Sequence, residues 1–120
     1  MKYYDVSFED LSIEEELFLT IGNFDGIHKG HEKIIKNLIS SAKSSNVKSA
    51  ILSFNPHPKI FFNGEKNFLI NSIEKKISIL QNLNIDYLID LKFDDKLTHL
   101  SFDEFEQSIL IQKLNIKKLY

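Results

Sequence analysis

The chain has 120 residues, 42% of them hydrophobic and 27% charged, which is enough for one domain with a core of its own. A formal net charge of -2 excludes a large phosphodiester partner on electrostatic grounds, so we expect no nucleic-acid binding. With no cysteine, no apolar stretch long enough for a bilayer and no signal-peptide order at the N-terminus, we expect a cytoplasmic protein that makes no membrane contact.

The first half of the chain predicts strands separated by a helix. The lead-in is weakly patterned and predicts at most one short strand at residues 3–8. Residues 17–21 are apolar and end at a glycine, which predicts a buried strand. A helix follows from Gly30 and closes at residues 44–46. Its predicted inner stripe consists of Ile34, Ile35, Leu38, Ile39 and Ala42.

The second half repeats this alternation. Residues 49–54 predict a strand that the following Asn-Pro-His-Pro sequence stops. Ser72 is the expected N-cap of a helix over 73–83, and residues 87–91 predict a third strand. Ser101 with Glu104 predicts a capping box at the start of a further helix. The inner side of that helix is assigned to Phe105, Ile109 and Leu110, and residues 116–120 begin a fourth strand.

Strands that alternate with helix-length segments indicate parallel crossovers. We therefore predict an α/β fold, a Rossmann-like parallel sheet with flanking helices, formed by residues 1–120 as a single domain. In such sheets ligands bind beyond the carboxyl ends of the strands. Three predicted loops open there, at residues 22–29, 55–63 and 92–100.

The first of these loops has the strongest chemical pattern. Residues 22–31 hold three of the four glycines and two of the four histidines. Gly22 and Gly26 relieve steric limits on the turn, and the helix that follows presents N–H groups and the positive end of its dipole to an anion. His28 and His31 can then reach a phosphate held there and stabilise the charge that grows during phosphoryl transfer.

Two other interpretations of this loop stay open. It could be a glycine turn with incidental histidines, or Asp25, His28 and His31 could hold zinc with one open position. All cationic residues of the chain are lysines, so phosphate recognition depends on lysine, histidine, backbone N–H groups or a metal rather than on the planar fork of arginine.

The sequence Gly-Asn-Phe-Asp-Gly-Ile-His-Lys-Gly-His at residues 22–31 resembles the nucleotidylyltransferase superfamily signature. More closely, it resembles the FAD synthetase (FMN adenylyltransferase) module of bifunctional bacterial riboflavin kinase/FAD synthetases. Phe-Asn-Pro-His-Pro at residues 54–58 resembles a second motif of that branch. Further matches are Lys76, Leu80 and Leu83 with residues 85–87, and Phe93, Asp94, Leu100, Ser101 and Phe105.

The resemblance implies transfer of an adenylyl group from ATP to FMN, which gives FAD and pyrophosphate with Mg²⁺ as the cofactor of ATP. It implies that His28 and His31 are the catalytic residues. The residues implied for ATP binding are Gly22, Asn23, Phe24, Asp25, Gly26, Lys29 and Gly30. The residues implied for flavin binding are Phe54, Pro56, His57, Pro58 and Phe62. No protein residue is assigned to the metal.

The chain also departs from the family pattern. The family carries a later Ser-Thr-Arg signature, whereas this sequence has no arginine, and we expect no riboflavin kinase domain. We therefore expect a domain that lacks its C-terminal portion and that could self-associate through an unfinished sheet edge. The alternatives are a non-catalytic or partner-dependent nucleotide-binding fragment, and another H-x-G-H nucleotidylyltransferase acting on pantetheine phosphate or glycerol phosphate.

Overall fold

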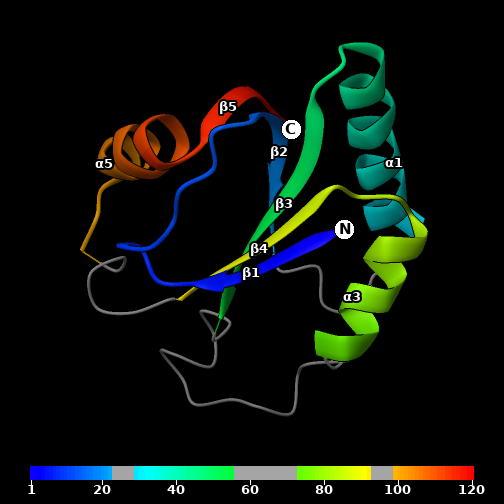
Figure 1. The fold of residues 1–120 in the computed structure, drawn as a ribbon, viewed down its shortest axis with the longest axis horizontal. Coiled ribbons are helices and arrows are strands. Elements are labelled where there is room, and N and C mark those ends of the chain that lie inside the picture. Colours follow the sequence, from blue (N-terminus) through cyan, green and yellow to red (C-terminus); the bar gives the residue numbers. More distant parts are fainter. Residues whose placement is uncertain (23–28, 56–72, 93–98) are drawn as a thin grey trace.

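The fold is that of a computed structural model, which describes residues 1–22, 29–55, 73–92 and 99–120. Its five strands form one sheet in the order β1-β4-β3-β2-β5, and every neighbouring pair is parallel (Figure 1). The strands are β1 (Lys2–Val6), β2 (Glu16–Ile21), β3 (Lys48–Asn55), β4 (Tyr87–Lys92) and β5 (Asn115–Leu119). The predicted α/β class and parallel sheet are confirmed.

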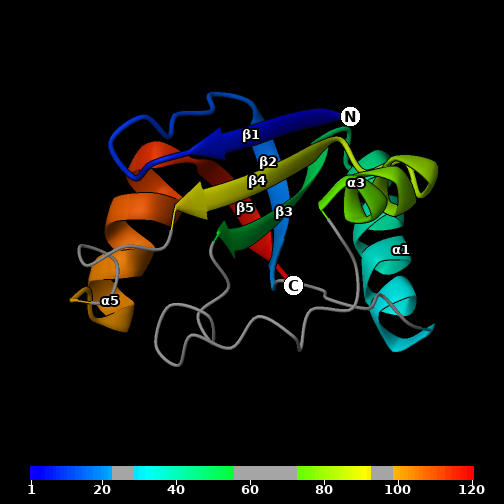
Figure 2. The ribbon, with the colours of Figure 1, turned by 90° about the horizontal axis from the view of Figure 1, so that it is seen from below.

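Helices cover both faces of this sheet. On one side lie α1 (Lys29–Ser44) and α3 (Ile73–Asn82), and on the other lies the helical segment made of α5 (Phe102–Phe105) and the π-helix η1 (Glu106–Lys113) (Figures 1 and 2). Among the described residues, no helix is both long enough and apolar enough to span a membrane.

Each face of the sheet has its own hydrophobic cluster, because side chains alternate between the faces along every strand. The cluster on the α5 and η1 side includes Leu19, Leu52 and Ile89. The cluster on the α1 and α3 side includes Ile51 and Leu88. Among the described residues, the largest fully buried side chains are Leu11, Leu17, Leu19, Ile35, Leu38, Ile51, Leu52, Leu80, Leu88, Ile89, Leu91 and Ile109.

The connections from α1 to β3 and from α3 to β4 are two copies of one turn. Asn46 ends α1 with φ of 58° and Asn84 follows α3 with φ of 69°, the left-handed region that asparagine tolerates better than most residues. In the first turn Val47 N donates to Ala42 O at 2.9 Å, and in the second Ile85 N donates to Leu80 O at 3.3 Å. The neighbouring parallel strands β3 and β4 therefore each begin after a helix that ends in the same way.

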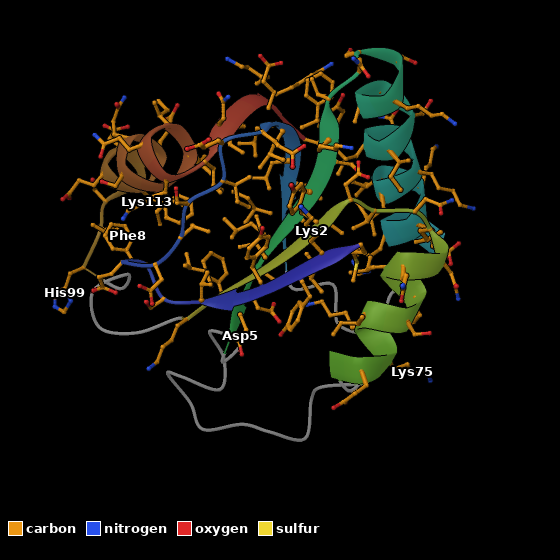
Figure 3. The ribbon with its side chains drawn as sticks, viewed as in Figure 1. Lys2, Asp5, Phe8, Lys75, His99 and Lys113 are labelled. Atoms are coloured by element: carbon orange, nitrogen blue, oxygen red, sulfur yellow. The ribbon has the colours of Figure 1, made fainter. Side chains whose placement is uncertain are left out.

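A capping box starts the last helical segment, as predicted. Ser101 N donates to Glu104 Oε1 at 3.1 Å, and Glu104 N donates to Ser101 Oγ at 3.2 Å. At the other end of this segment the Lys113 ammonium lies 5.0 Å from the Phe8 ring centroid and donates to Glu9 O at 3.4 Å (Figure 3). The helix is thereby fixed to the segment between β1 and β2.

Most predicted elements are confirmed with boundaries shifted by a residue or two. The lead-in strand forms at Lys2–Val6 and pairs with β4, which the weak pattern there did not indicate. Ile34 was wrongly placed in the buried stripe of α1: it is 46% exposed, and Ile35, Leu38 and Ala42 form the buried face. The π-helical hydrogen bonding of η1 was not predicted. Ser72, the expected cap of α3, lies outside the described residues.

Candidate functional site

The candidate site lies at the carboxyl edge of the sheet. Since the strands are parallel, β2, β3 and β4 all end at this edge, and α1 and α3 begin there (Figure 1). Gly22 extends the edge, because its N–H donates to Leu52 O at 3.0 Å after β2 has ended. Open α/β sheets bind their ligands in this position.

Of the residues assigned to catalysis and ATP binding, three lie in the described part with their surroundings: Gly22, Gly30 and His31. Gly30 is exposed in the first turn of α1. His31 follows it and is half-buried, with its Nδ1 atom shielded from solvent. A helix N-terminus directs N–H groups and the positive end of its dipole outward, so this corner suits an anion.

The other residues assigned to the site lie wholly or partly outside the described residues. Lys29 opens α1, but only its backbone is described. The remaining assigned residues lie outside the described residues, and their roles stay predictions: Asn23, Phe24, Asp25, Gly26, His28, Pro56, His57, Pro58 and Phe62. The zinc interpretation depends on two of them, and among the described residues no group of three His, Asp or Glu side chains could hold a metal.

Phe54, assigned to flavin binding, lies on the other face of the sheet from His31. It packs against the cluster on the α5 side, with its ring centroid 6.3 Å from that of Phe105. Its ring is half-buried there. A flavin contact from Phe54 therefore remains a prediction, and its described environment is that of a packing residue.

The sequence interpretation missed a buried polar network at the same edge. Asp90 of β4 is 2% exposed and accepts hydrogen bonds from two hydroxyl groups. Tyr3 Oη, from β1, donates to Asp90 Oδ2 at 2.7 Å, and Ser53 Oγ, from β3, donates to Asp90 Oδ1. One sequence signal could have indicated it, because a single carboxylate interrupts the apolar strand Tyr-Leu-Ile-Asp-Leu.

The protonation state of Tyr3 follows from this environment. Burial raises the pKa of the Tyr3 phenol well above its ordinary value of 10.0, and the hydrogen bond to Asp90 and the negative charges of Asp90, Asp5 and Glu74 raise it further. Tyr3 is therefore a protonated donor at neutral pH. The network thus joins three strands through one carboxylate.

A second charged group is buried near this edge. Lys76 stands one turn before Leu80 on α3 and is only 6% exposed. Since α3 begins at the carboxyl edge, Lys76 occupies the part of the helix nearest the candidate site. The same residue carried part of the family resemblance.

A second serine–aspartate pair lies at the opposite, amino end of the sheet, away from the candidate site. Asp86 Oδ2 accepts from Ser49 N at 2.9 Å and from Ser49 Oγ at 3.1 Å, and Asp86 N donates to Ser49 Oγ at 3.1 Å. A hollow of about 400 Å³ lies beside this pair, between the two helix-to-strand turns. Its lining includes Lys43, Asn46, Lys48 and Asn84, none of which was assigned to the site.

The family model and the curated relatives that match this chain indicate the same family. Residues 10–120 match a family model described as FAD synthetase. A bifunctional riboflavin kinase/FMN adenylyltransferase of Buchnera aphidicola subsp. Schizaphis graminum is 38% identical over 100 residues, covering 82% of this chain and 32% of the relative. The Escherichia coli K12 protein of the same name is 28% identical over 107 residues, covering 88% of this chain and 34% of the relative. The chain thus spans about a third of the length of these curated relatives.

A solved structure shares the fold. The crystal structure of a protein described as a macrolide-efflux protein from Streptococcus pneumoniae superposes with a TM-score of 0.82. The match covers 98% of this chain and 46% of that one, at 22% sequence identity. At this identity the likeness shows the architecture alone.

Proposed function

The chain belongs to the FAD synthetase family, and we propose that its carboxyl-edge site takes part in adenylyl transfer from ATP to FMN. The observation that carries the proposal is the family match over residues 10–120, together with the position of Gly30 and His31 in the first turn of α1 at that edge. The products are FAD and pyrophosphate. Because the chain spans about a third of its curated relatives, this activity is proposed for the site rather than for the isolated chain.

In the proposed reaction a phosphate oxygen of FMN attacks the α-phosphorus of ATP. The bond from that phosphorus to the oxygen bridging the β-phosphorus breaks, and pyrophosphate leaves with the bonding electrons. Little covalent chemistry falls to the protein, so its contribution is positioning and electrostatic stabilisation. His31, from the first turn of α1, and His28 before it are proposed to donate hydrogen bonds to the α-phosphate oxygens as their charge grows.

The remaining assigned residues complete the proposal on the basis of the family motifs. Gly22, Gly30 and the intervening segment are proposed to surround the nucleotide, and Lys29 to neutralise the leaving pyrophosphate. Residues 56–58 with Phe62 are proposed to border the flavin. Mg²⁺ is proposed to enter with ATP, since this ion is bound mainly through substrate phosphates and water with few protein carboxylates.

A second proposal concerns the outer edge of the sheet. β5 pairs with β2 on one side, and on its other side no strand of the described residues follows. Leu119 on this strand is 48% exposed, which favours contact with another segment or a second copy of the chain. Lys117 and Lys118 are also exposed there, and their charge opposes pairing of two identical β5 edges. Sedimentation at increasing ionic strength tests this, because salt that screens the lysines should increase any self-association.

Calorimetric titration with ATP and Mg²⁺ tests the nucleotide site. We expect His31→Ala and His28→Ala each to weaken ATP binding about tenfold, the order expected when a hydrogen bond to a charged group is lost. His99→Ala is the matched control, since His99 is exposed and lies beside the α5 end of the molecule, away from α1 (Figure 3). Unchanged ATP affinity in both His28→Ala and His31→Ala contradicts the proposal. Chromatography of a reaction with FMN and ATP then tests for FAD.

A further inference from the structure

Two serine–aspartate pairs connect β3 and β4, one near each end of the strands. At the amino end Ser49 bonds to Asp86, and at the carboxyl end Ser53 bonds to Asp90. The amino-end pair includes the backbone N–H groups of both residues. Among the described residues, the carboxyl-end pair uses side chains only and includes a third strand through Tyr3.

The carboxyl-end network faces the same layer as His31. Ile51 and Leu88 pack against α1 and α3, and they lie opposite each other in the register of β3 and β4. Ser53 and Asp90 are the next register pair on the same face, because side chains alternate along a strand. The two residues therefore lie between the sheet and the helices, one step nearer the carboxyl edge.

The network is also an expensive arrangement for folding. Ser53 is 0% exposed and Asp90 is 2% exposed, so a carboxylate is held away from water. Hydroxyl donors compensate only part of the cost of desolvating such a group. Such departures from an apolar interior are expected at functional sites, where a fixed geometry is required.

Three strands are joined just before the chain leaves the sheet. Asp5, near the end of β1 (Figure 3), lies opposite Asp90 in the register. β3 ends at Asn55, directly before the Pro-His-Pro sequence assigned to the flavin, and β4 ends at Lys92. The nucleotide corner is fixed differently, through the Gly22–Leu52 backbone hydrogen bond and the start of α1. The network thus belongs to β1, β4 and β3, and it shares only β3 with the nucleotide corner.

We propose that Ser53, Asp90 and Tyr3 form a positioning network for the flavin substrate. By holding β1, β4 and β3 together near their carboxyl ends, the network fixes the end of β3, which the residues assigned to the flavin follow directly in the sequence. Its loss is expected to weaken FMN binding and to leave ATP binding unchanged. The inference rests on the proposed function, because it assumes that FMN binds at this edge.

The test compares variants at the two ends of the same strand pair. Ser53→Ala, Tyr3→Phe and Asp90→Ala remove one member each, and Asp90→Asn keeps an acceptor oxygen as the conservative variant. Ser49→Ala is the matched control, since it removes a serine of the same strand from the amino-end pair. FMN binding is measured by quenching of flavin fluorescence, ATP binding by calorimetry, and folding by thermal unfolding of the same 120-residue chain.

The expected result is selective. Ser53→Ala and Asp90→Ala weaken FMN binding about tenfold, the order of effect seen when a group that orients binding residues is lost, and Asp90→Asn weakens it by about threefold or less. ATP affinity stays within about twofold of wild type in every variant, a difference of roughly 0.4 kcal/mol. Ser49→Ala lowers the unfolding temperature and leaves FMN affinity unchanged.

Three results overturn the inference. One is unchanged FMN affinity in Ser53→Ala and Asp90→Ala. Another is equal weakening of FMN and ATP binding, which indicates general loosening of the fold. The third is a Ser49→Ala variant that loses FMN binding as strongly as Ser53→Ala. If Ser53→Ala or Asp90→Ala does not fold, Tyr3→Phe decides in the same way, because Tyr3, at 38% exposed, is the most exposed residue of the three. A wild-type chain that does not bind FMN contradicts the proposed function as well, whereas wild-type binding with unaffected variants contradicts only this inference.

Discussion

The two ends of the β3–β4 strand pair carry the same residue types and use them differently. At the amino end the Asp86 carboxylate accepts the backbone N–H of Ser49 at 2.9 Å and so replaces a sheet hydrogen bond. At the carboxyl end the Asp90 carboxylate accepts from the side chains of Ser53 and Tyr3. The first pair satisfies a buried backbone group that the fold cannot leave unpaired, whereas the second holds a buried carboxylate that accepts from two hydroxyl groups.

This difference separates a folding role from a positioning role. Removing the amino-end carboxylate leaves a backbone donor without an acceptor, which costs stability directly. Removing the whole carboxyl-end network leaves apolar groups in its place, which costs little in folding but frees the ends of three strands. Stability and ligand binding should therefore respond in opposite ways at the two ends. Each of the following predictions tests that separation.

The largest expected effect on the free energy of unfolding comes from replacing Leu88, which lies on β4 between Asp86 and Asp90. Leu88 is fully buried against α1 and α3, so Leu88→Ala should lower the free energy of unfolding by about 3 kcal/mol, measured by urea denaturation. Because the substitution loosens both ends together, the ratio of FMN to ATP affinity in the folded fraction should not change. A selective loss of FMN binding in this variant would show that general packing, rather than the carboxyl-end network, determines flavin affinity.

The amino-end pair is expected to be the next most sensitive. Asp86→Ala leaves the N–H of Ser49, a residue only 1% exposed, without its acceptor and should lower the free energy of unfolding by about 2 kcal/mol. Asp86→Asn keeps an acceptor oxygen and should lose less. Urea denaturation of both variants gives the comparison. A loss in Asp86→Asn as large as that in Asp86→Ala would contradict a hydrogen-bonding role for this side chain.

Local sequence patterns were sufficient to predict most of the elements around these pairs. The apolar run of β2 is stopped by Gly22, and the run of β3 is stopped by the Pro-His-Pro sequence, so their limits were predictable. The Ser101–Glu104 capping box likewise depends on neighbours in the chain and was predicted from the residues alone. Such features are encoded within a few residues of where they act.

Features that depend on distant residues were not predictable in this way. Tyr3 and Asp90 are 87 positions apart, and nothing near either residue indicates that β1 pairs with β4 rather than lying at the other edge. Ile34 fits the helical stripe, yet its exposure depends on how α1 is rotated on the sheet, which is set by Ile35 and Leu38. At the candidate site the motif predicted His31 and Gly30, and the buried support beneath the edge came from the structure.

Replacing the two buried members of the carboxyl-end network should raise the free energy of unfolding, by less than the Leu88 and Asp86 variants lower it. In the double variant Ser53→Ala/Asp90→Leu the desolvated carboxylate and its buried partner are both absent, so the free energy of unfolding should rise by about 1 kcal/mol. The Tyr3 hydroxyl can turn to water, since Tyr3 is 38% exposed. The single variant Asp90→Leu is the control and should be less stable than the double variant, because it leaves the Ser53 hydroxyl buried without its acceptor. A double variant less stable than wild type would assign the network a folding role.

The smallest expected effect is on the free energy of unfolding at alkaline pH. Tyr3 belongs to the carboxyl-end network, and Tyr87 begins β4 at the amino end. Burial, followed by the hydrogen bond to a carboxylate, raises the pKa of both phenols above 10.0; the carboxylate is Asp90 for Tyr3 and Glu15 for Tyr87. A pKa that is higher in the folded state gives stability that is complete below the unfolded pKa and is lost as the pH rises through the folded one. The free energy of unfolding should therefore fall from about pH 10 upward.

Phenylalanine variants measured by urea denaturation across the alkaline range separate the two contributions. Tyr87→Phe should flatten the decline more than Tyr3→Phe, because Tyr87 is 3% exposed and Tyr3 is 38% exposed, so solvent screens the charge that forms on Tyr3. The double variant should have the flattest profile. Declines as steep as that of wild type in both single variants would show that neither hydroxyl–carboxylate bond controls alkaline stability. A larger effect of Tyr3→Phe would show that the carboxyl-end network contributes more to folding than its side-chain-only bonding implies, and it would weaken the separation of roles between the two ends.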